Sequence, residues 1–317
     1  MLFAWIRHPS LRQHGTRAYL RQPENPSRMR AESAGNAGMW IDIGVNLTHS
    51  RFDPDRDAVI ARAIDAGVER MILTSSDGPG VLAAKQLRQR DPERLWITSG
   101  IHPHEAGQLR DEDWETVCTH AEQPDVVAIG ECGLDYFRNL SEPEQQRRIF
   151  EKQVELAIRL GKPLFLHERH AHADLLAILE NAGPALPKAV LHCFTGTAVE
   201  LEHYLTLGLW IGLTGWVCDE RRGRHLVALL PEIPEDRLLI ETDAPYLLPR
   251  TLPDPPRNKR NEPAFLPHIA AFLASHLNRD LMDFSSQLRT NSFHFFWPHA
   301  AFQELPSHAH ARSFSPR

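Results

Sequence analysis

Eight short apolar runs recur along the chain, and each is followed by a polar loop and then by a stretch with helical spacing of apolar residues. A strand-plus-helix unit repeated in this way is typical of a (β/α)8 TIM barrel, whose functional site lies at the carboxyl ends of the strands. Several runs lack clean alternation of apolar and polar residues, as expected for parallel strands buried on both faces. We therefore predict an α/β barrel. The runs are Ile41–Val45, Met71–Thr74, Leu95–Ser99, Val126–Gly130, Pro163–Leu166, Ala189–Leu191, Leu209–Leu213 and Leu238–Ile240.

An acid or an imidazole follows most of these runs. Because the carboxyl ends of all strands meet at one rim of a barrel, residues far apart in the sequence should converge there. The residues just past the runs are Asn46, Ser75, Ser76, His102, His104, Glu131, His167, His192, Gly215, Trp216 and Asp243.

Helix signals support the alternation. Asp53 is predicted as the N-cap of the first helix, with Pro54 at its first position. A second helix is predicted to start at Ser141, with Glu144 completing a capping box and Gly161 as the stop. The proline-rich segment 249–263 is too rigid and polar for the core, so we expect a long loop over the barrel mouth.

Composition is ordinary for a soluble globular protein, at 42% apolar and 24% charged residues, and no window resembles a membrane span. Residues 1–38 carry six arginines and two glutamates, a local charge of +4, which leaves −10 for residues 39–317. For this leader we consider a disordered extension, a start codon placed upstream of a true first residue at Met39, or a targeting segment. We predict one barrel domain over 39–297 and a mobile tail over 298–317.

The four cysteines show no CxxC spacing. This favours reduced thiols of a cytoplasmic protein over a disulfide framework or a zinc ribbon. Cys132 and Cys193 neighbour candidate site residues, but strand alternation should turn them away from the site, so we interpret them as packing residues.

Two imidazoles and two carboxylates form the strongest candidate site. Glu131, His167, His192 and Asp243 each follow a different run, and together they make a mixed nitrogen and oxygen ligand set for a divalent cation. Such a cation polarises a phosphoryl or carbonyl oxygen and lowers the pKa of bound water, while a nearby carboxylate takes the proton. Asp243 is our candidate for that carboxylate.

Other polar residues have weaker assignments. For His102 and His104 we favour substrate contact over metal ligation or loop capping. Arg221 and Arg222 are typical of a solvated helix start, with phosphate binding as the alternative. The basic residues of the mouth loop suit an anionic substrate better, because they follow the strand of Asp243; they are Arg257, Lys259 and Arg260.

Several long strings closely resemble the TatD family of metal-dependent deoxyribonucleases, from Met39 to about Phe296. They are IDIGVNLTHSRF, GIHPHEAG, VVAIGECGLDYFRN, AVLHCFTGT, IGLTGWVCDERRG, LLIETDAPYLLPR and RNEPAFLPHI. The resemblance implies a TIM barrel related to the amidohydrolases, and a divalent-metal-dependent 3′ to 5′ exonuclease acting on single-stranded DNA or RNA.

The resemblance also assigns residues. It implies that Glu131, His167 and His192 are metal ligands and that Asp243 is the catalytic acid close to the metal. We therefore predict Asp243 and Glu131 as catalytic, and all four as metal-binding, with Mg²⁺ favoured over Mn²⁺ and Zn²⁺. We assign substrate binding to Asn46, His102, His104, Arg169 and Arg260.

One departure concerns the first strand. The broader family carries His-x-His there, whereas this chain has Gly44-Val45-Asn46, a pattern that the TatD branch shares. Two ligands of a binuclear site are therefore missing, and we expect a single firmly bound metal.

Two further classes of function compete with the nuclease. The same site suits ester or amide hydrolysis, such as removal of an aminoacyl group from tRNA. A non-catalytic binding protein is the third class. We expect a cytoplasmic monomer whose partners are single-stranded DNA or RNA ends, with no membrane partner. The acidity of residues 39–317 argues against wrapping of duplex DNA.

Overall fold

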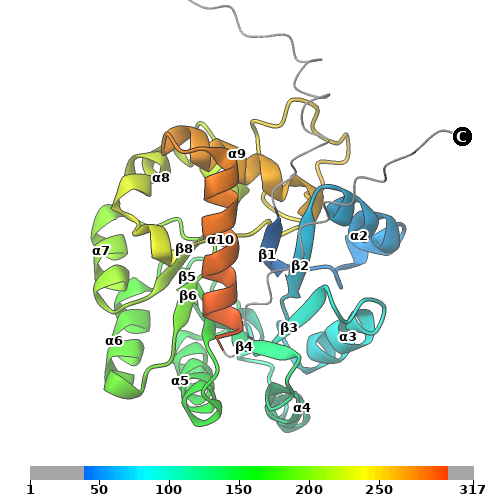
Figure 1. Ribbon diagram of the computed structural model, residues 1–317. Helices are drawn as coiled ribbons and strands as arrows, with labels where there is room; N and C mark the ends of the chain where they lie inside the picture. Colours follow the sequence, from blue (N-terminus) through cyan, green and yellow to red (C-terminus); the bar gives the residue numbers. More distant parts are fainter. Residues whose placement is uncertain (1–38, 299–317) are drawn as a thin grey trace, which may run out of the picture. The chain divides into compact units, whose positions relative to one another are not determined.

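The computed structural model describes residues 39–298, in which eight parallel strands form one sheet in sequence order (Figure 1). The predicted leader 1–38 and all of the predicted tail except Pro298 lie outside the described residues. The strands are β1 (Trp40–Val45), β2 (Val68–Leu73), β3 (Leu95–Ser99), β4 (Val126–Asp135), β5 (Leu164–Arg169), β6 (Ala189–Leu191), β7 (Trp210–Leu213) and β8 (Leu238–Ile240).

Residues just beyond β8 bring the two edge strands together. Asp243 N donates to Gly44 O at 2.9 Å, and Asn46 N donates to Ala244 O at 2.8 Å. The prediction of a (β/α)8 barrel is confirmed, and all eight predicted runs contribute to strands.

Helices alternate with the strands. They are α2 (Arg56–Asp65), α3 (Gly78–Arg88), α4 (Asp111–Ala121), α5 (Pro143–Leu160), α6 (His172–Ala182), α7 (Ala198–Thr206), α8 (Arg224–Leu229), α9 (Leu266–His276) and α10 (Leu281–Phe296). Short 3₁₀ turns are η1 (Ser50–Phe52), η2 (Pro103–Glu105), η3 (Gly183–Ala185), η4 (Gly215–Cys218), η5 (Leu230–Glu232), η6 (Glu235–Arg237) and η7 (Pro263–Phe265).

The predicted start of the first helix was wrong. Helix α2 begins at Arg56 with Asp55 at its N-cap, whereas Asp53 ends the turn η1. The Asp53 carboxylate bonds the Arg56 guanidinium at 2.5 Å and caps no backbone amide of α2. A side chain that is engaged in this way does not cap a helix, so the sequence signal at Asp-Pro marked the turn and not the helix.

The predicted start of the second helix was also wrong, by two residues. Helix α5 begins at Pro143, and the capping box joins Glu142 and Gln145. Ser141 instead accepts from Gly107 N and donates to His104 O, each at 2.8 Å, so its hydroxyl ties two loops together. The predicted stop at Gly161 is confirmed, because this residue takes the left-handed conformation at φ 62°.

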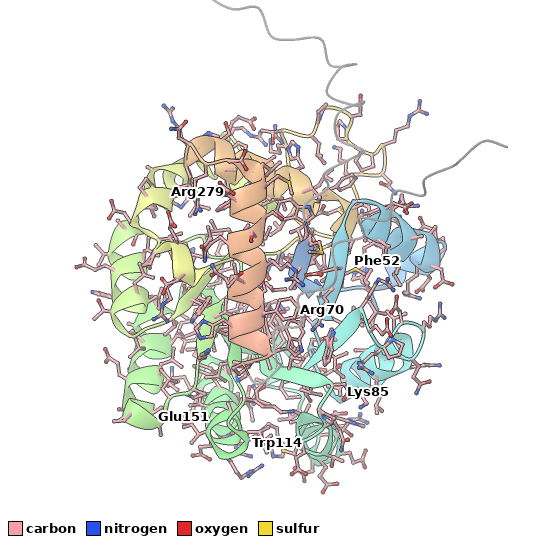
Figure 2. The ribbon with its side chains drawn as sticks, in the orientation of Figure 1. Phe52, Arg70, Lys85, Trp114, Glu151 and Arg279 are labelled. Carbon is pink, nitrogen blue, oxygen red and sulfur yellow. The ribbon has the colours of Figure 1, made fainter. Side chains whose placement is uncertain are left out.

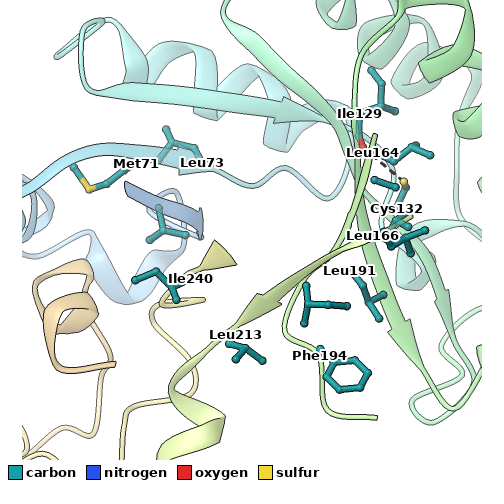
Figure 3. Packing of buried hydrophobic residues seen from close by; sticks show 14 of the residues in the cluster. Met71, Leu73, Ile129, Cys132, Leu164, Leu166, Leu191, Phe194, Leu213 and Ile240 are labelled. Atoms are coloured by element: carbon teal, nitrogen blue, oxygen red, sulfur yellow. Dashed lines mark hydrogen bonds between the residues drawn. The ribbon is translucent and has the colours of Figure 1, made fainter. Parts of the chain in front are cut away.

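The core lies on both faces of the sheet. One set of apolar side chains fills the space between strands and helices, and Figure 3 shows part of it around Leu166, Leu191 and Leu213. A second set, which includes Ile43 and Phe165, occupies the barrel interior together with Phe295 and Phe296 from α10. Burial on both faces explains why the strand sequences lack alternation.

After β8 the chain forms no helix until η7, which confirms the predicted long loop (Figure 1). Among the described residues, none of the helices combines the length and the apolar character that a membrane crossing requires.

Candidate metal centre

Strands β4 and β5 bring Glu131 and His167 together. Both strands continue past the predicted ends, so Glu131 lies within β4 and His167 within β5. Glu131 Oε1 lies 2.9 Å from His167 Nδ1. Gly133 makes this close packing feasible: its φ is 135°, and a Cβ there would lie 2.0 Å from the carbonyl oxygen of His167. No other residue type fits that position without moving β5.

Three imidazoles surround a single carboxylate oxygen. Besides His167, His192 Nε2 lies 2.8 Å and His102 Nε2 lies 3.3 Å from Glu131 Oε1. Glu131 and His192 are both buried, with 8% and 6% of their surfaces exposed. Four side chains from the ends of β3, β4, β5 and β6 therefore converge at one point of the rim.

Buried carboxylates lie behind two of these imidazoles. The Nε2 of His167 lies 3.3 Å from Asp135 Oδ2, and the Nδ1 of His192 lies 3.6 Å from Glu241 Oε1. With a cation in the site, a carboxylate that is hydrogen-bonded behind an imidazole, as Asp135 is behind His167, would keep the proton on the outer nitrogen and leave the lone pair of the inner nitrogen to the metal. The inner nitrogens of His167 and His192 are 3.4 Å apart and both face Glu131.

His102 has a different arrangement. Its Nδ1 accepts a hydrogen bond from the backbone N–H of His104 at 3.1 Å, which puts the proton of the neutral ring on Nε2. Burial lowers the pKa of His102 to about 4, so the neutral ring is the form present at pH 7. The ligand atoms of His102, Glu131 and His167 lie within 4.8 Å of one another, so distance alone would allow His102 to be a metal ligand. Because its Nε2 carries the proton, however, His102 is better suited to donate a hydrogen bond to Glu131.

Charge within the cluster is balanced. Burial raises the pKa of Glu131, but the charge of His192 and the hydrogen bonds from His102 and His167 outweigh it and hold the pKa well below its usual value. Burial lowers the pKa of His192, yet the carboxylates of Glu131 and Glu241 raise it well above its usual value. For His167 the bonds to Asp135 and Glu131 likewise overcome burial, and its pKa is raised.

These donors fit a divalent cation. Two imidazole nitrogens and a carboxylate oxygen face one point, since His167 Nδ1 and His192 Nε2 lie 2.9 and 2.8 Å from Glu131 Oε1. A cation between the inner nitrogens would fix the orientation of both rings.

Asp243 and Asn46 face each other beside the cluster. Asn46 Nδ2 donates to Asp243 Oδ1 at 3.0 Å, and Asn46 Oδ1 accepts from Thr74 Oγ1 at 2.9 Å, which fixes the amide. Burial, reinforced by the charges of Glu131 and Glu241, raises the pKa of Asp243 to about 7, although His192 opposes this. A carboxyl group that titrates near neutrality suits proton transfer at pH 7.

The other predicted substrate contacts are dispersed. His104 Nε2 bonds Asp135 Oδ2 at 2.7 Å, behind His167. The Arg169 guanidinium lies 3.9 Å from the ring centre of Phe137, at the end of β5. Both residues are thus tied to the two strands that carry Glu131 and His167.

Arg260 does not join the cluster. It is 7% exposed, and its guanidinium bonds Asp55 at 2.7 and 2.8 Å and Glu262 at 2.7 Å. These bonds attach the mouth loop to α2, which leaves the predicted substrate contact of Arg260 without support. Among the basic residues of that loop, Arg257 and Lys259 are exposed.

Both cysteines beside the site residues lie outside the cluster. Cys132 is fully buried, with its thiol directed at the carbonyl oxygen of Ile129 (Figure 3) and at that of Phe165. The Cys193 thiol lies 3.4 Å from Thr214 Oγ1, and burial raises its pKa to about 12. All four cysteines are free, as predicted.

Sequence reasoning missed Asp135 and Glu241. Both lie in strings that were singled out, GECGLD and LLIETDAPYL. The available signal was a second acid close to each predicted ligand or base, but only the contacts show which acid lies behind a histidine.

Comparison with known proteins agrees with this geometry. Residues 41–297 match the family model described as TatD related DNase. The chain is 54% identical over 234 residues to the protein named 3′-5′ ssDNA/RNA exonuclease TatD from Erwinia billingiae, covering 74% of this chain and 90% of that protein.

Solved structures extend the likeness. A hydrolase TatD family protein from Entamoeba histolytica superimposes with a TM-score of 0.76 at 29% identity, covering 83% of this chain and all of that chain. The TatD homologue YJJV from Escherichia coli gives a TM-score of 0.74 at 26% identity, covering 81% and 97% of the two chains. With a matching family model over most of its length and relatives of this similarity, the chain belongs to the TatD-related DNase family.

Proposed function

We propose that this protein is a divalent-metal-dependent nuclease that removes nucleotides from the 3′ end of single-stranded DNA or RNA. The relatives named 3′-5′ ssDNA/RNA exonuclease TatD support the substrate and the polarity. The observation that carries the proposal is the pair of inward-facing nitrogens on His167 and His192, each with a carboxylate behind it and with Glu131 between them.

In this proposal Glu131, His167 and His192 hold the cation. Mg²⁺ is the proposed native ion, and the mixed donor set also suits Mn²⁺ and Zn²⁺. When bound, such a cation polarises the phosphodiester and makes water a better nucleophile.

The protein supplies the proton transfer and the orientation. Asp243 accepts a proton from the attacking water, since its pKa of about 7 leaves it partly ionised at neutral pH. Asn46 orients the Asp243 carboxylate, and the buried His102 donates to Glu131 and keeps its charge in place. Glu131 thus acts as both ligand and catalytic residue.

The proposed setting is the cytoplasm, where the four free cysteines would stay reduced. The proposed partners are the ends of single strands. Residues 39–317 are acidic, and a strand end that reaches a local cation requires fewer basic residues than a wrapped duplex does.

The test is digestion of 5′-labelled single-stranded oligonucleotides by the purified chain with Mg²⁺, Mn²⁺ or Zn²⁺. We expect a ladder that shortens from the 3′ end, and a loss of roughly 10²- to 10⁴-fold in kcat for Asp243→Asn. Asp236→Asn, at an acid whose side chain is 73% exposed, is the control and should behave like the parent.

Intact DNA and RNA with every metal would overturn the proposal, as would an Asp243→Asn variant with unchanged activity. Faster turnover of aminoacyl-tRNA in a parallel assay would replace the nuclease with a deacylase that uses the same site.

A further inference from the structure

Two exposed aromatic side chains lie on loops that leave the metal centre, and the proposed chemistry uses neither. Phe137 follows β4 and is 53% exposed, and Tyr246 follows β8 and is 47% exposed. Exposure alone is common for single surface residues, so the position of each ring relative to the candidate site is what matters. Each lies two or three residues beyond an acid of the site, Asp135 or Asp243.

The position of Phe137 is fixed by the metal centre itself. Asp135 Oδ1 accepts from the backbone N–H groups of Phe137 at 3.0 Å and Arg138 at 2.8 Å. The other oxygen of the same carboxylate faces His104 and His167. One buried side chain therefore sets both the direction of a metal-site histidine and the start of the loop that carries Phe137.

Basic and aromatic groups surround the Phe137 ring. The Arg169 guanidinium carbon lies 3.9 Å from the ring centre, and the His170 ring approaches edge-on with centres 5.0 Å apart. Arg169 follows His167 by two residues on β5 and makes no ion pair within residues 39–298, so its charge is available. We call Phe137, Arg169 and His170 the rim platform.

A half-exposed ring with an unpaired guanidinium over one face suits a nucleobase and its phosphate. Base stacking on an aromatic side chain is tolerant of sequence, because every base has a π face, and a neighbouring arginine adds charge attraction. Bases within a duplex are already stacked, so such a platform selects unpaired strand ends.

Tyr246 lies across the mouth. In the strand order β1 to β8, its loop follows β8, which is half-way round the barrel from β4. Tyr246 N donates to Asp243 O at 3.0 Å, and the ring meets His49 edge-on at 5.6 Å. Burial and the charge of Asp243 raise the pKa of the Tyr246 phenol, although the charge of Arg51 opposes this.

We propose that the rim platform stacks against one of the two nucleobases that flank the scissile phosphate, and that Tyr246 contacts the other from the opposite side of the mouth. The strand end then crosses the metal centre between two aromatic rings. This inference rests on the proposed function, and it gives a physical reason for a preference for single strands.

The first test compares kinetics of Phe137→Ala and Phe137→Trp on single-stranded oligonucleotides. We expect Phe137→Ala to raise KM roughly tenfold to hundredfold, since one stacked base is worth about 1–3 kcal/mol, with kcat changed by less than about twofold. Phe137→Trp keeps a stacking surface and should restore KM. Leu82→Ala, at a side chain on α3 that is 51% exposed, controls for truncation of a surface residue.

The second test removes the base from the substrate. Oligonucleotides with an abasic site at the terminal or the penultimate 3′ position should bind more weakly to the parent protein. At one of these two positions, Phe137→Ala should cause no further rise in KM, because the stacking partner is already absent. The proposal would be overturned if Phe137→Ala raised KM as much on both abasic substrates as on the intact strand, or if it did not raise KM on the intact strand.

A binding measurement separates this inference from the nuclease proposal. In Ca²⁺, a single strand with 2-aminopurine near its 3′ end should lose fluorescence on binding the parent and Phe137→Trp, but much less on binding Phe137→Ala. Quenching that depends on Phe137 in a protein without nuclease activity would refute the proposed function alone. Nuclease activity with equal quenching by all three proteins would refute the platform alone.

Discussion

At the scale of single residues, the candidate metal centre has two buried carboxylates behind its histidines. Asp135 and Glu241 are 1% and 0% exposed, and each lies behind one histidine of the cluster. The hydrogen bond from Asp135 to His167 Nε2 turns the other ring nitrogen of His167 toward Glu131, and Glu241 places a negative charge 3.6 Å from His192 Nδ1.

Replacement of Asp135 by asparagine should weaken metal binding by about 10- to 100-fold, because the amide orients His167 less firmly and removes a negative charge. Titration with Mn²⁺ by isothermal calorimetry measures the change. Asp57→Asn, at an exposed acid on α2, is the control. An Asp135→Asn variant with the affinity of the parent would show that His167 needs no such partner.

A third acid, Asp42 on β1, is fully buried. Its side chain accepts from the backbone N–H of Thr242 and bonds the Thr242 hydroxyl. Burial raises its pKa to about 8, so the folded protein keeps this carboxyl protonated at pH values where the unfolded chain, with a pKa near 3.8, has lost the proton.

The pH dependence of stability follows from that difference. Between about pH 5 and 8 the folded state binds one more proton at Asp42, so the free energy of unfolding should fall as pH rises, by up to about 1.4 kcal/mol per pH unit. Asp42→Asn removes this contribution and should give a flatter dependence. Urea unfolding of both proteins at several pH values checks it, and parallel curves would contradict the assignment to Asp42.

At the scale of elements, helix α5 positions the loops of the site through two buried glutamines. Gln153 accepts from the N–H of Ile101 at 2.7 Å and donates to its carbonyl at 2.9 Å, directly before His102. Gln146 bonds the backbone N–H of Asp135 at 2.8 Å and its carbonyl at 3.2 Å. One helix therefore fixes the backbone on both sides of the metal cluster.

Gln153→Leu should destabilise the fold by about 1–3 kcal/mol, because it leaves two buried backbone groups of Ile101 without partners. It should also weaken binding of the metal, since His102 loses its support. Urea unfolding and Mn²⁺ titration measure the two effects. Glu151→Leu changes an exposed position of the same helix (Figure 2) and should leave both nearly unchanged.

At the scale of the described barrel, helix α10 closes the end opposite the metal centre. Asn291 bonds Leu238 O at the start of β8, and Ser285 bonds Met39 O just before β1. Phe295 and Phe296 enter the interior cluster from this side. Arg70, labelled in Figure 2, lies 4.6 Å from the ring centre of Trp297, where α10 ends.

Phe295→Ala should cost about 3–5 kcal/mol of stability, because Phe295 is fully buried and its removal leaves a cavity. Activity per folded molecule and the affinity for Mn²⁺ should stay at the parent's values, since the metal centre lies at the other rim. Thermal unfolding together with metal titration provides the check. A large loss of Mn²⁺ affinity in fully folded Phe295→Ala would show that the two ends of the barrel are coupled.

Sequence reasoning predicted the barrel, because few other folds contain eight buried strands that each precede an amphipathic helix. It also predicted that Glu131, His167 and His192 converge, since residues at the carboxyl ends of parallel strands meet at one rim. The predicted helix starts at Asp53 and Ser141 were wrong because both side chains bond other groups: Asp53 bonds the nearby Arg56 guanidinium, and Ser141 bonds the distant carbonyl of His104.

What the sequence alone determined is therefore the fold and the set of residues at the rim, both of which follow from periodicity and position along strands. The tertiary structure decided the function of each polar side chain within that set. Arg260 bonds Asp55 and Glu262, while Asp135 and Glu241 orient the histidines. Hydrogen bonds and charge pairs between distant segments depend on side-chain geometry within a few ångströms, and a linear pattern carries no record of such distances.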